Sequence, residues 1–440
     1  MRVFLERGIF PMVRPRFFAQ KIRSFASNSL LSRGLETWDV CVVGGGVMGS
    51  ATAYFLKSQA PDLSVVVIEQ DPTYKRASTG LSVGSIRQQF SIDGNIEMSL
   101  FSSGFIRNVG EYLSIEGDED EADVQFVNSG YLFLATESGV PILRENHSLQ
   151  TSLGAKVELL SPGELGSRFP WMTVDDVAEG ALGTENEGWF DPWSLLNCFK
   201  KKASSIGVEY AHGECVDIGV VDGRVTHVDV VEETNRASGN VTRLKVGTAV
   251  NASGPWASKV HRMVDDPLND LPVRPRRRNV FVVHAPDGPV DSCPMLIDPS
   301  GVYVRREGTG GHFLCGKSPE PEDDPDADDL EVDHDFFEEH IWERLAHRVP
   351  AFENLKVVNS WSGFYEYNTM DQNAIIGRHP SISNYLMICG FSGHGIQQSP
   401  AAGRGVSELI LQGRYTTIDL APFGYERILS KTPLLEKNVI

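Results

Sequence analysis

The stretch that decides the fold runs from Val40 to Gly49 and reads VCVVGGGVMG. Its first four residues form a short apolar run bounded by glycine, which is typical of a buried parallel strand. A helical pattern follows, and then a second β-branched run that ends at Glu69. This order of strand, glycines, helix, strand and acidic residue predicts a Rossmann-type α/β domain that binds a dinucleotide.

Each glycine of the motif has a physical role in such a domain. Gly44 permits the tight turn, Gly46 lets the backbone approach a diphosphate, and Gly49 lets the helix pack closely on the strand. The helix N-terminus offers free N–H groups and a partial positive charge to the phosphates. Glu69 is placed to accept hydrogen bonds from a ribose and would repel the extra phosphate of NADP. NAD and FAD share this fingerprint, so the segment alone leaves the cofactor open.

Length and charge limit the classes of function. A chain of 440 residues has room for about two or three domains. The net charge of −19 argues against a nucleic-acid partner, because phosphate binding needs clustered Lys and Arg. The sequence contains no apolar run of ~18 residues, so we expect no transmembrane span. The six cysteines are scattered, which excludes a zinc knuckle or CxxC pair and fits a reducing compartment.

Residues 1–36 differ from the rest of the chain. They carry six arginines and one lysine against two acidic residues, with several serines and interspersed apolar residues. This composition predicts a mitochondrial or plastid transit peptide. A disordered basic tail, or a start codon placed too early, is the alternative.

Two later segments distinguish between the cofactors. The first reads AVNASGPW from Ala249 to Trp256, and the second reads CGFSGHGI from Cys389 to Ile396. With the opening motif, they resemble the D-amino-acid oxidase and sarcosine oxidase family. The resemblance implies FAD as the cofactor and a chain that returns to the FAD-binding domain at its C-terminus. Taken alone, the second segment is a glycine-rich turn that opens a helix.

Four further stretches narrow the resemblance. They are 78–84, 187–193, 331–337 and 367–373, and they are similar to a mitochondrial family member that acts as an assembly factor for respiratory complex I. The resemblance implies a location in the mitochondrial matrix, with docking on the inner membrane left open. It also implies contact with complex I subunits or assembly intermediates. The alternative is an active dehydrogenase of N-methyl or D-amino acids that uses an acceptor other than oxygen.

The resemblance also predicts a domain division and a set of cofactor contacts. The FAD-binding domain is expected to comprise 37–110, 190–265 and 355–425, interleaved with a mixed or antiparallel sheet domain for substrate, 111–189 and 266–354, and followed by a tail, 426–440. Cofactor contacts are expected at Gly44, Gly46, Val47, Met48, Gly49, Glu69, Gln70, Ser78, Thr79, Leu81, Ser82, Val216, Ala252, Ser253, Gly254, Trp256, Gly390, Ser392, Gly393, His394, Gly395 and Ile396.

Relatives oxidise the carbon of an amine by passing a hydride to the flavin. Arg87 falls where they place an arginine that pairs with the substrate carboxylate, although a structural role is the simpler interpretation. His394, in the glycine-rich turn, is the second catalytic candidate, with ring packing as the alternative. The side chains of Tyr365 and Tyr367 are candidates for the pocket wall.

The chain departs from the family pattern at four positions. Gln397 replaces a cationic ligand of the substrate carboxylate, and Leu314 replaces a lysine that activates oxygen, so reaction with oxygen should be slow. Phe364 and Leu81 fall where relatives carry the cysteine or histidine that bonds to the flavin. Neither side chain is able to form that bond, so we expect FAD to be held non-covalently.

Local signals predict several connections. Asp222-Gly223 marks a tight hairpin turn, and Asp191-Pro192 marks a helix start with a capping side chain. The acidic, proline-containing segment 319–329 is predicted to be a solvated loop rather than an ion or partner site. It lacks the glycine and closing glutamate of a calcium-binding EF-hand, and no metal cluster emerges from the motifs.

Overall fold

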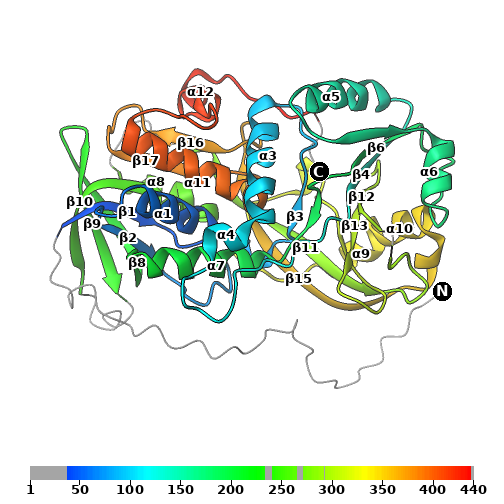
Figure 1. Ribbon diagram of the computed structural model, residues 1–440, viewed down its shortest axis with the longest axis horizontal. Helices are drawn as coiled ribbons and strands as arrows, with labels where there is room; N and C mark the ends of the chain where they lie inside the picture. Colours follow the sequence, from blue (N-terminus) through cyan, green and yellow to red (C-terminus); the bar gives the residue numbers. More distant parts are fainter. Residues whose placement is uncertain (1–36, 233–239, 265–270, 292, 438–440) are drawn as a thin grey trace.

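The structure is a computed structural model that describes residues 37–232, 240–264, 271–291 and 293–437. The predicted transit peptide, 1–36, lies outside the described residues. Within the described part of the chain, the strands form a seven-stranded sheet, an eight-stranded sheet and a two-stranded pair. Figure 1 shows the two large sheets in different halves of the molecule, each with its own helices.

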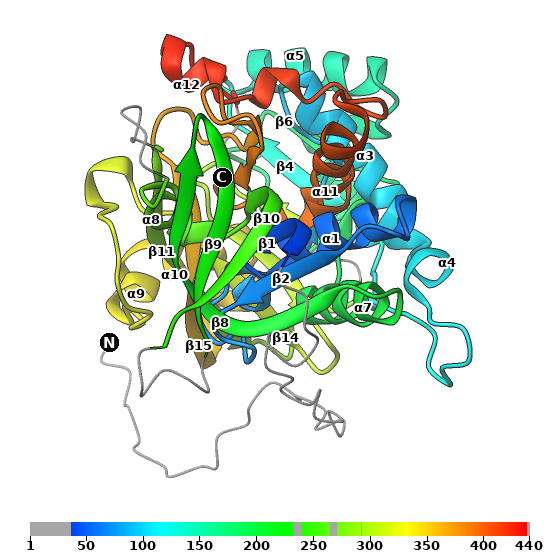
Figure 2. The ribbon, with the colours of Figure 1, turned by 90° about the vertical axis from the view of Figure 1, so that its left-hand side faces the viewer.

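The seven-stranded sheet has a parallel centre in the order β8, β2, β1, β10 and β17. Antiparallel β16 lies at the edge beside β17, and β9 joins the outer parts of β8 and β10 into a meander, visible in Figure 2. The Rossmann-type fold class is therefore confirmed. The strands are β1 (Thr37–Val43), β2 (Val65–Glu69), β8 (Glu209–Val221), β9 (Arg224–Glu232), β10 (Thr242–Asn251), β16 (Ile375–Arg378) and β17 (Tyr385–Cys389).

Both faces of this sheet are buried, as a run of apolar residues in a parallel strand requires. In β1, Val40 and Val42 join one apolar cluster, while Cys41 and Val43 join another on the opposite face. The first cluster includes residues of five helices and the second includes the meander and α8. The helices around this sheet are α1 (Val47–Gln59), α3 (Asp93–Arg107), α4 (Val109–Leu113), α7 (Pro192–Ser205), α8 (Ala257–His261) and α11 (Gly395–Gln412).

The eight-stranded sheet is mixed, because β12 and β4 pair in parallel while its other neighbours are antiparallel. Its order is β15, β11, β14, β13, β12, β4, β6 and β5. These are β4 (Tyr131–Ala135), β5 (Val157–Leu160), β6 (Glu179–Gly183), β11 (Val273–His284), β12 (Met295–Ile297), β13 (Tyr303–Glu307), β14 (His312–Gly316) and β15 (Lys356–Asn368). Its helices are α5 (Val140–Ser152), α6 (Pro162–Arg168), α9 (Asp335–His340) and α10 (Trp342–Arg348).

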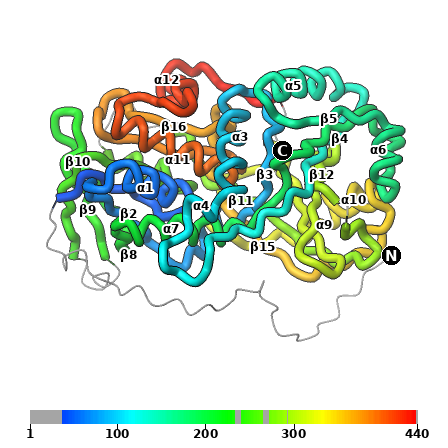
Figure 3. Tube along the Cα trace, in the orientation of Figure 1, coloured from blue at the N-terminus to red at the C-terminus, as the bar shows by residue number. Residues whose placement is uncertain are grey.

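The remaining elements are short. They are α2 (Ser78–Leu81), β3 (Ser85–Ile86), β7 (Gly188–Trp189), α12 (Glu426–Ser430) and the 3-10 turns η3 (Gly254–Trp256), η4 (Pro321–Asp323), η5 (Pro350–Asn354) and η6 (Ala421–Phe423). The chain passes between the sheets several times, as the tube in Figure 3 shows. No helix among the described residues is long and apolar enough to cross a bilayer, and all six cysteines are free.

The predicted domain boundaries differ from the strand pairing in two places. Strand β15 was placed with the FAD-binding segments, but it pairs with β11 along its whole length in the eight-stranded sheet. The predicted tail contains α12, whose Arg427 forms a buried ion pair with Asp371. Glu436 is buried as well and accepts hydrogen bonds from Ser91. Neither feature is visible in local sequence, because both depend on partners more than 50 residues away.

The local signals are confirmed where the conformation is set by neighbouring residues. Asp222 and Gly223 both have positive φ, 49° and 68°, in the turn that joins antiparallel β8 and β9. The Asp191 side chain accepts a hydrogen bond from Trp193 N at the start of α7. The acidic segment 319–329 is a mostly exposed loop, as predicted, but three of its carboxylates pair with arginines of β11, and one of these, Asp324, is nearly buried.

Candidate functional site

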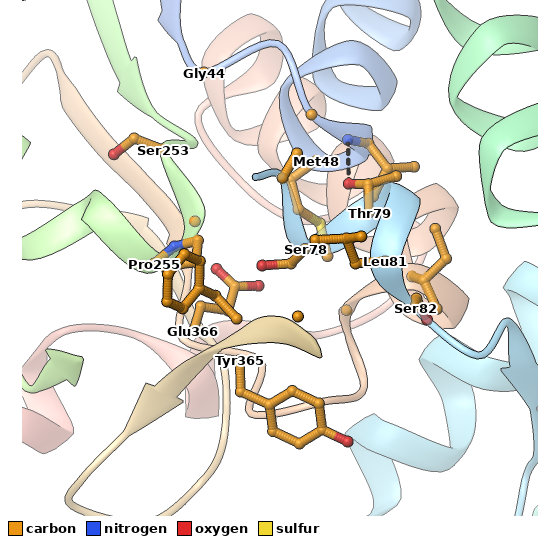
Figure 4. Close-up of a pocket in the computed structure, with 18 of the residues that line it drawn as sticks. Gly44, Met48, Ser78, Thr79, Leu81, Ser82, Ser253, Pro255, Tyr365 and Glu366 are labelled. Atoms are coloured by element: carbon orange, nitrogen blue, oxygen red, sulfur yellow. Dashed lines mark hydrogen bonds between the residues drawn. The ribbon is translucent and has the colours of Figure 1, made fainter. Parts of the chain in front are cut away.

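A cavity of about 490 Å³ lies where the two sheets meet. One part of its wall, the glycine end, comes mainly from the seven-stranded sheet and its connections and consists of Gly44, Gly46, Val47, Met48, Glu69, Ser78 and Ala252–Gly254. The other part, the arginine end, comes mainly from the eight-stranded sheet and consists of Arg87, Tyr131, Arg278, Tyr303 and Tyr365. Figure 4 shows the residues around the glycine end together with Tyr365 and Glu366.

At the glycine end, the backbone approaches too closely for any larger residue. A Cβ atom on Gly44, whose φ is +105°, would lie 2.3 Å from the Ala252 carbonyl oxygen. A Cβ atom on Gly49 would lie 1.9 Å from the Gly44 carbonyl oxygen. Gly49 thus serves helix–strand packing and does not itself line the cavity. The N-terminus of α1 faces the cavity between these glycines, as an anion site at a helix end requires.

Two side chains tie the glycine turn to its surroundings. Glu69 accepts hydrogen bonds from Gly45 N, at 2.8 Å, and from Asp71 N, at 2.7 Å. Burial raises the pKa of its carboxyl, and these two hydrogen bonds counteract part of that effect. Thr79 Oγ1 accepts a hydrogen bond from Val47 N, drawn as a dashed line in Figure 4. Glu69 lines the cavity and keeps free lone pairs for a ribose hydroxyl.

Four buried polar atoms along the cavity wall have no hydrogen-bond partner among the described residues. They are Tyr74 Oη, Ser78 Oγ, Arg87 Nη1 and Arg278 Nε. Buried polar atoms are nearly always paired, so these four atoms indicate where a bound molecule makes hydrogen bonds. They extend from beside Glu69 to the arginine end, which fits an extended dinucleotide such as FAD with a second, smaller ligand beside it.

Arg87 is the central residue of the arginine end. Its side chain is buried, and its guanidinium carbon lies 4.5 Å from the ring centre of Phe90 and 5.1 Å from that of Phe133. Its backbone N–H donates to Gln397 Oε1, so the amide at the predicted cationic position holds the backbone at Arg87, directly after β3. Nη1 is left to bind an anionic group.

A buried carboxyl lies behind this arginine. Glu187 accepts hydrogen bonds from Gln88 N, at 2.6 Å, and from Gln89 Nε2, at 2.8 Å. Burial raises its pKa to about 7, while these hydrogen bonds and the Arg87 charge act in the opposite direction. Glu187 does not line the cavity, so it acts on the segment 87–89 from behind.

His394 contacts Arg87 rather than standing free. Its Nε2 lies 3.2 Å from Arg87 Nη2, and because arginine only donates, this nitrogen accepts the hydrogen bond. Burial and the Arg87 charge lower its pKa to about 3, so the imidazole is neutral at physiological pH. Its ring also packs edge-on against Phe90, with ring centres 5.1 Å apart. These contacts match the packing and anchoring interpretation better than a proton carrier.

Most of the other predicted cofactor residues line the cavity, but three besides Gly49 do not. Val216 is 40% exposed, because a β-bulge between Cys215 and Asp217 turns it outward. Gly213, Glu214 and Cys215 line the cavity in its place. Gly390 and Ser392 instead shape the turn before α11: Gly390 N donates to Glu366 Oε2, and Ser392 Oγ accepts from Asn368 N.

The four departures from the family pattern occupy different places. Gln397, Phe364 and Leu81 line the cavity, whereas Leu314 is buried in β14 away from it. A leucine at position 314 therefore does not tell whether a cation would lie beside a bound flavin. Among the described residues, the cations that line the cavity are Arg76, Arg87, Lys259 and Arg278.

Sequence reasoning did not identify Arg278. Its guanidinium lies 4.8 Å from the ring centre of Tyr365 and forms two hydrogen bonds, of 2.7 and 2.8 Å, with Asp324. Asp324 belongs to the acidic segment 319–329, which therefore contributes a buried carboxylate rather than only solvated charges. The juxtaposition of three arginines, 276–278, and an acidic run elsewhere in the chain was the only available signal.

Sequence reasoning also missed Glu366, a buried carboxyl of β15 that lines the cavity. Burial raises its pKa to about 8, against the hydrogen bonds that it accepts from Gly390 and Phe391. No ion pair of Glu366 occurs within the described ranges. Nothing in the local sequence distinguishes this glutamate from an exposed strand residue.

Two clusters on the described surface have the composition of a metal site. They are Asp175, Asp176 and His347, and Asp217, His227 and Asp229. In each cluster a carboxylate already pairs with an arginine, Asp176 with Arg348 and Asp229 with Arg243. The arginine partners therefore account for the positions of Asp176 and Asp229 without a bound metal.

Comparison with known proteins assigns the family. The family model described as FAD dependent oxidoreductase matches residues 39–409. FAD-dependent oxidoreductase domain-containing protein 1 of Xenopus laevis is 49% identical, over 92% of this chain and 85% of the relative. Its counterpart in Bos taurus is 44% identical, over 89% and 85%. Mitochondrial sarcosine dehydrogenase of Mus musculus is 26% identical, over 86% of this chain and 40% of that protein.

The fold also matches solved structures. The L-proline dehydrogenase of P. horikoshii superimposes with a TM-score of 0.78 at 24% identity, over 90% of this chain and 99% of that one. The cavity residues fit FAD, since they offer a glycine turn at a helix N-terminus, a ribose-facing carboxylate and unpartnered polar atoms between them. The chain belongs to the family of FAD-dependent oxidoreductases.

Proposed function

We propose that this chain is a mitochondrial FAD-dependent oxidoreductase-like protein needed for the assembly or stability of respiratory complex I. The observation that carries the proposal is the contrast between the two ends of the cavity. The glycine end has the features of a cofactor site, whereas Gln397, at a position where relatives carry a cation, uses its amide oxygen on Arg87 N. The resemblance described above supports the assembly role, and the names of relatives such as mitochondrial sarcosine dehydrogenase support the compartment.

FAD would serve such a protein even without turnover. A ligand that binds only the folded state stabilises that state in proportion to its concentration over its dissociation constant. The glycine turn, Glu69, Tyr74 and Ser78 would hold it. Phe364 and Leu81 offer no nucleophile, so we propose that the cofactor is released intact when the chain is denatured. A flavin adduct on the denatured chain, detected by mass spectrometry, would contradict this.

The second candidate function is an active dehydrogenase of N-methyl or D-amino acids with an acceptor other than oxygen. Bound FAD would accept a hydride from the carbon next to the amine. Arg87 favours this function, because its Nη1 faces the cavity without a partner and suits a substrate carboxylate. The aromatic side chains around it would exclude water from that ion pair.

Cells that lack the endogenous protein test the primary proposal. Gly49→Val removes the cofactor turn, so complex I, measured on native gels, should be lost together with FAD. Normal complex I with this variant alone would remove the cofactor from the assembly role. Arg87→Ala separates the two candidates, because assembly that survives this change does not need turnover of a carboxylate substrate.

Anaerobic spectroscopy of the purified protein tests the second candidate. A panel of N-methyl and D-amino acids is added while the visible flavin band is followed. Bleaching by one compound would establish a dehydrogenase and its substrate class. If only dithionite bleaches the band, the dehydrogenase candidate fails and the assembly role with a structural cofactor stands.

A further inference from the structure

Glu366 is a carboxyl within the cavity to which the family comparison assigns no role. It lies on β15 beside Tyr365, and consecutive strand residues point to opposite faces. Tyr365 contacts Arg278 at the arginine end. Glu366 faces the other way: its Oε1 would lie 3.2 Å from a Cβ atom on Gly395 and its Oε2 3.8 Å from one on Gly254. Its surroundings therefore belong to the seven-stranded sheet and α11.

The hydrogen bonds of Glu366 leave part of the carboxyl unused. Oε2 accepts from Gly390 N at 3.2 Å, and no lysine, arginine or histidine of the described chain forms an ion pair with the group. Its side chain is 8% exposed, and burial raises its pKa to about 8. At neutral pH the carboxyl therefore carries a proton, which it offers to the cavity.

A second unused polar group lines the same cavity. Ser78 Oγ is buried without a hydrogen-bond partner. Figure 4 shows the Ser78 hydroxyl and the Glu366 carboxyl directed toward one another from opposite walls. A neutral carboxyl and a hydroxyl together complement the hydroxyl groups of a polyol, because each side both donates and accepts.

FAD contains such a polyol, the ribityl chain between its ring and its diphosphate. The diphosphate is served by the N-terminus of α1, and an ionised carboxylate near it would be repelled. We propose that Glu366 binds the ribityl hydroxyls of FAD as a neutral carboxyl, together with Ser78, and that the protein therefore takes up a proton when it binds FAD above neutral pH. The inference rests on FAD as the cofactor and does not depend on the assembly role.

The groups that surround Glu366 leave it as the main source of such a pH effect. Cys389 of β17 has a thiol pKa raised well above its usual value by burial and by the Glu366 charge. His394, at the start of α11, has its pKa lowered to about 3. Burial raises the pKa of Tyr365, and on β11 Pro275 is opposite Glu366 with arginines on either side.

The other carboxyls of the wall are Glu69, Asp71 and Glu214. Burial raises the pKa of Glu69, whereas hydrogen bonds from Thr73 and Lys75 lower that of Asp71 against the effect of burial. Glu214 pairs with Lys259.

The direction of the effect follows from linkage. In the free protein the carboxyl loses its proton as the pH rises through about 8, whereas in the complex the ribityl hydroxyls hold it neutral. Binding must then restore the proton, so FAD affinity falls with rising pH. From pH 7 to pH 9 the dissociation constant should increase about tenfold.

The test measures FAD binding to the apoprotein by flavin fluorescence between pH 6.5 and 9. Glu366→Gln keeps a neutral donor of the same shape, so it should bind FAD at pH 7 within about twofold of wild type and lose the pH dependence. Glu366→Leu removes the donor and should bind more weakly at every pH. Glu179→Gln is the matched control, since Glu179 is also 8% exposed but lies on β6 and pairs with Arg144.

Two further measurements locate the effect. ADP carries the diphosphate without the ribityl chain, so its binding should not respond to Glu366→Gln. Calorimetry of wild type in two buffers with different heats of ionisation should detect proton uptake at pH 8.5, and this readout needs no variant to fold. The proposal is overturned if wild type shows no slope, if Glu366→Gln keeps the slope, or if ADP shows the same slope as FAD.

Discussion

At the glycine end of the cavity, the wall is made of backbone that approaches closely, and at the arginine end it is made of charged and aromatic side chains. Gly44 at this end and Gly49 behind it, in α1, leave no room for a Cβ atom, so neither position tolerates a larger residue. Arg87 and Arg278 at the other end differ in their partners: Arg278 forms an ion pair with Asp324, while Arg87 forms no ion pair with another described residue and its Nη1 has no hydrogen-bond partner. Close backbone packing therefore determines what binds at the glycine end, whereas charged side chains determine what binds at the arginine end.

We expect the largest effect from a substitution that disrupts the close backbone packing behind the glycine end. Gly49→Val forces a side chain against the Gly44 carbonyl oxygen, which would lie only 1.9 Å from the new Cβ atom. We expect loss of bound flavin and loss of a cooperative melt, because backbone has to move at the centre of the sheet. The flavin-to-protein absorbance ratio and thermal unfolding measure both.

Gly104→Ala is the matched control for this variant. A Cβ atom there contacts nothing within 4 Å, and the residue lies inside α3. The variant should keep its flavin and gain up to ~1 kcal/mol of stability. If the Gly49→Val protein retained FAD and wild-type stability, close backbone packing at the glycines would not be what FAD binding at this end depends on.

The second effect tests charge at the arginine end. Asp324→Asn leaves Arg278 nearly buried without its carboxylate, and breaking a buried pair costs about 3–5 kcal/mol of unfolding free energy. Asp329→Asn breaks an exposed pair with Arg277 and should cost far less, because solvent screens the attraction between exposed charges. Urea unfolding compares the two variants. Equal losses would show that burial of the first pair does not matter.

The third effect concerns the free nitrogen of Arg87. Arg87→Lys keeps the charge but loses the planar fork, so a small carboxylate should bind about 10- to 100-fold more weakly. Perturbation of the flavin spectrum by added carboxylates measures this binding. Arg144→Lys, at an exposed surface pair with Glu179, should leave it unchanged. Unaltered carboxylate binding in Arg87→Lys would assign the arginine a structural role.

The smallest effect is a change in the pH dependence of stability. Burial raises the pKa of Glu187 to about 7, so the folded chain keeps this proton at a pH where the unfolded chain has lost it. Its contribution is therefore fully present below the ordinary carboxyl pKa and is lost as the pH rises through about 7. Glu187→Gln should flatten unfolding free energy against pH between about 5 and 7. An unchanged profile would mean that Glu187 is ionised in the folded protein.

Local physical rules explain how much of the molecule was predictable. The strand–glycine–helix unit, the Asp191 cap and the turn at Asp222-Gly223 each depend on residues adjacent in sequence, and all three are confirmed. Arg87 lines the cavity, at the position that the resemblance implied. Val216 was wrong as a cavity residue, because a bulge in β8 shifts the alternation of side chains by one residue.

The amino-acid sequence by itself determined the dinucleotide-binding unit, because backbone conformation at its glycines and the apolar pattern of its strands are properties of short segments. The tertiary structure alone decided that Arg278 is neutralised by Asp324, 46 residues away. It also decided that the Glu366 carboxyl is buried, which raises its pKa to about 8 and keeps it protonated at neutral pH. Burial and ion pairing depend on which surfaces meet, and a carboxyl or guanidinium has no such partner until the two sheets pack together.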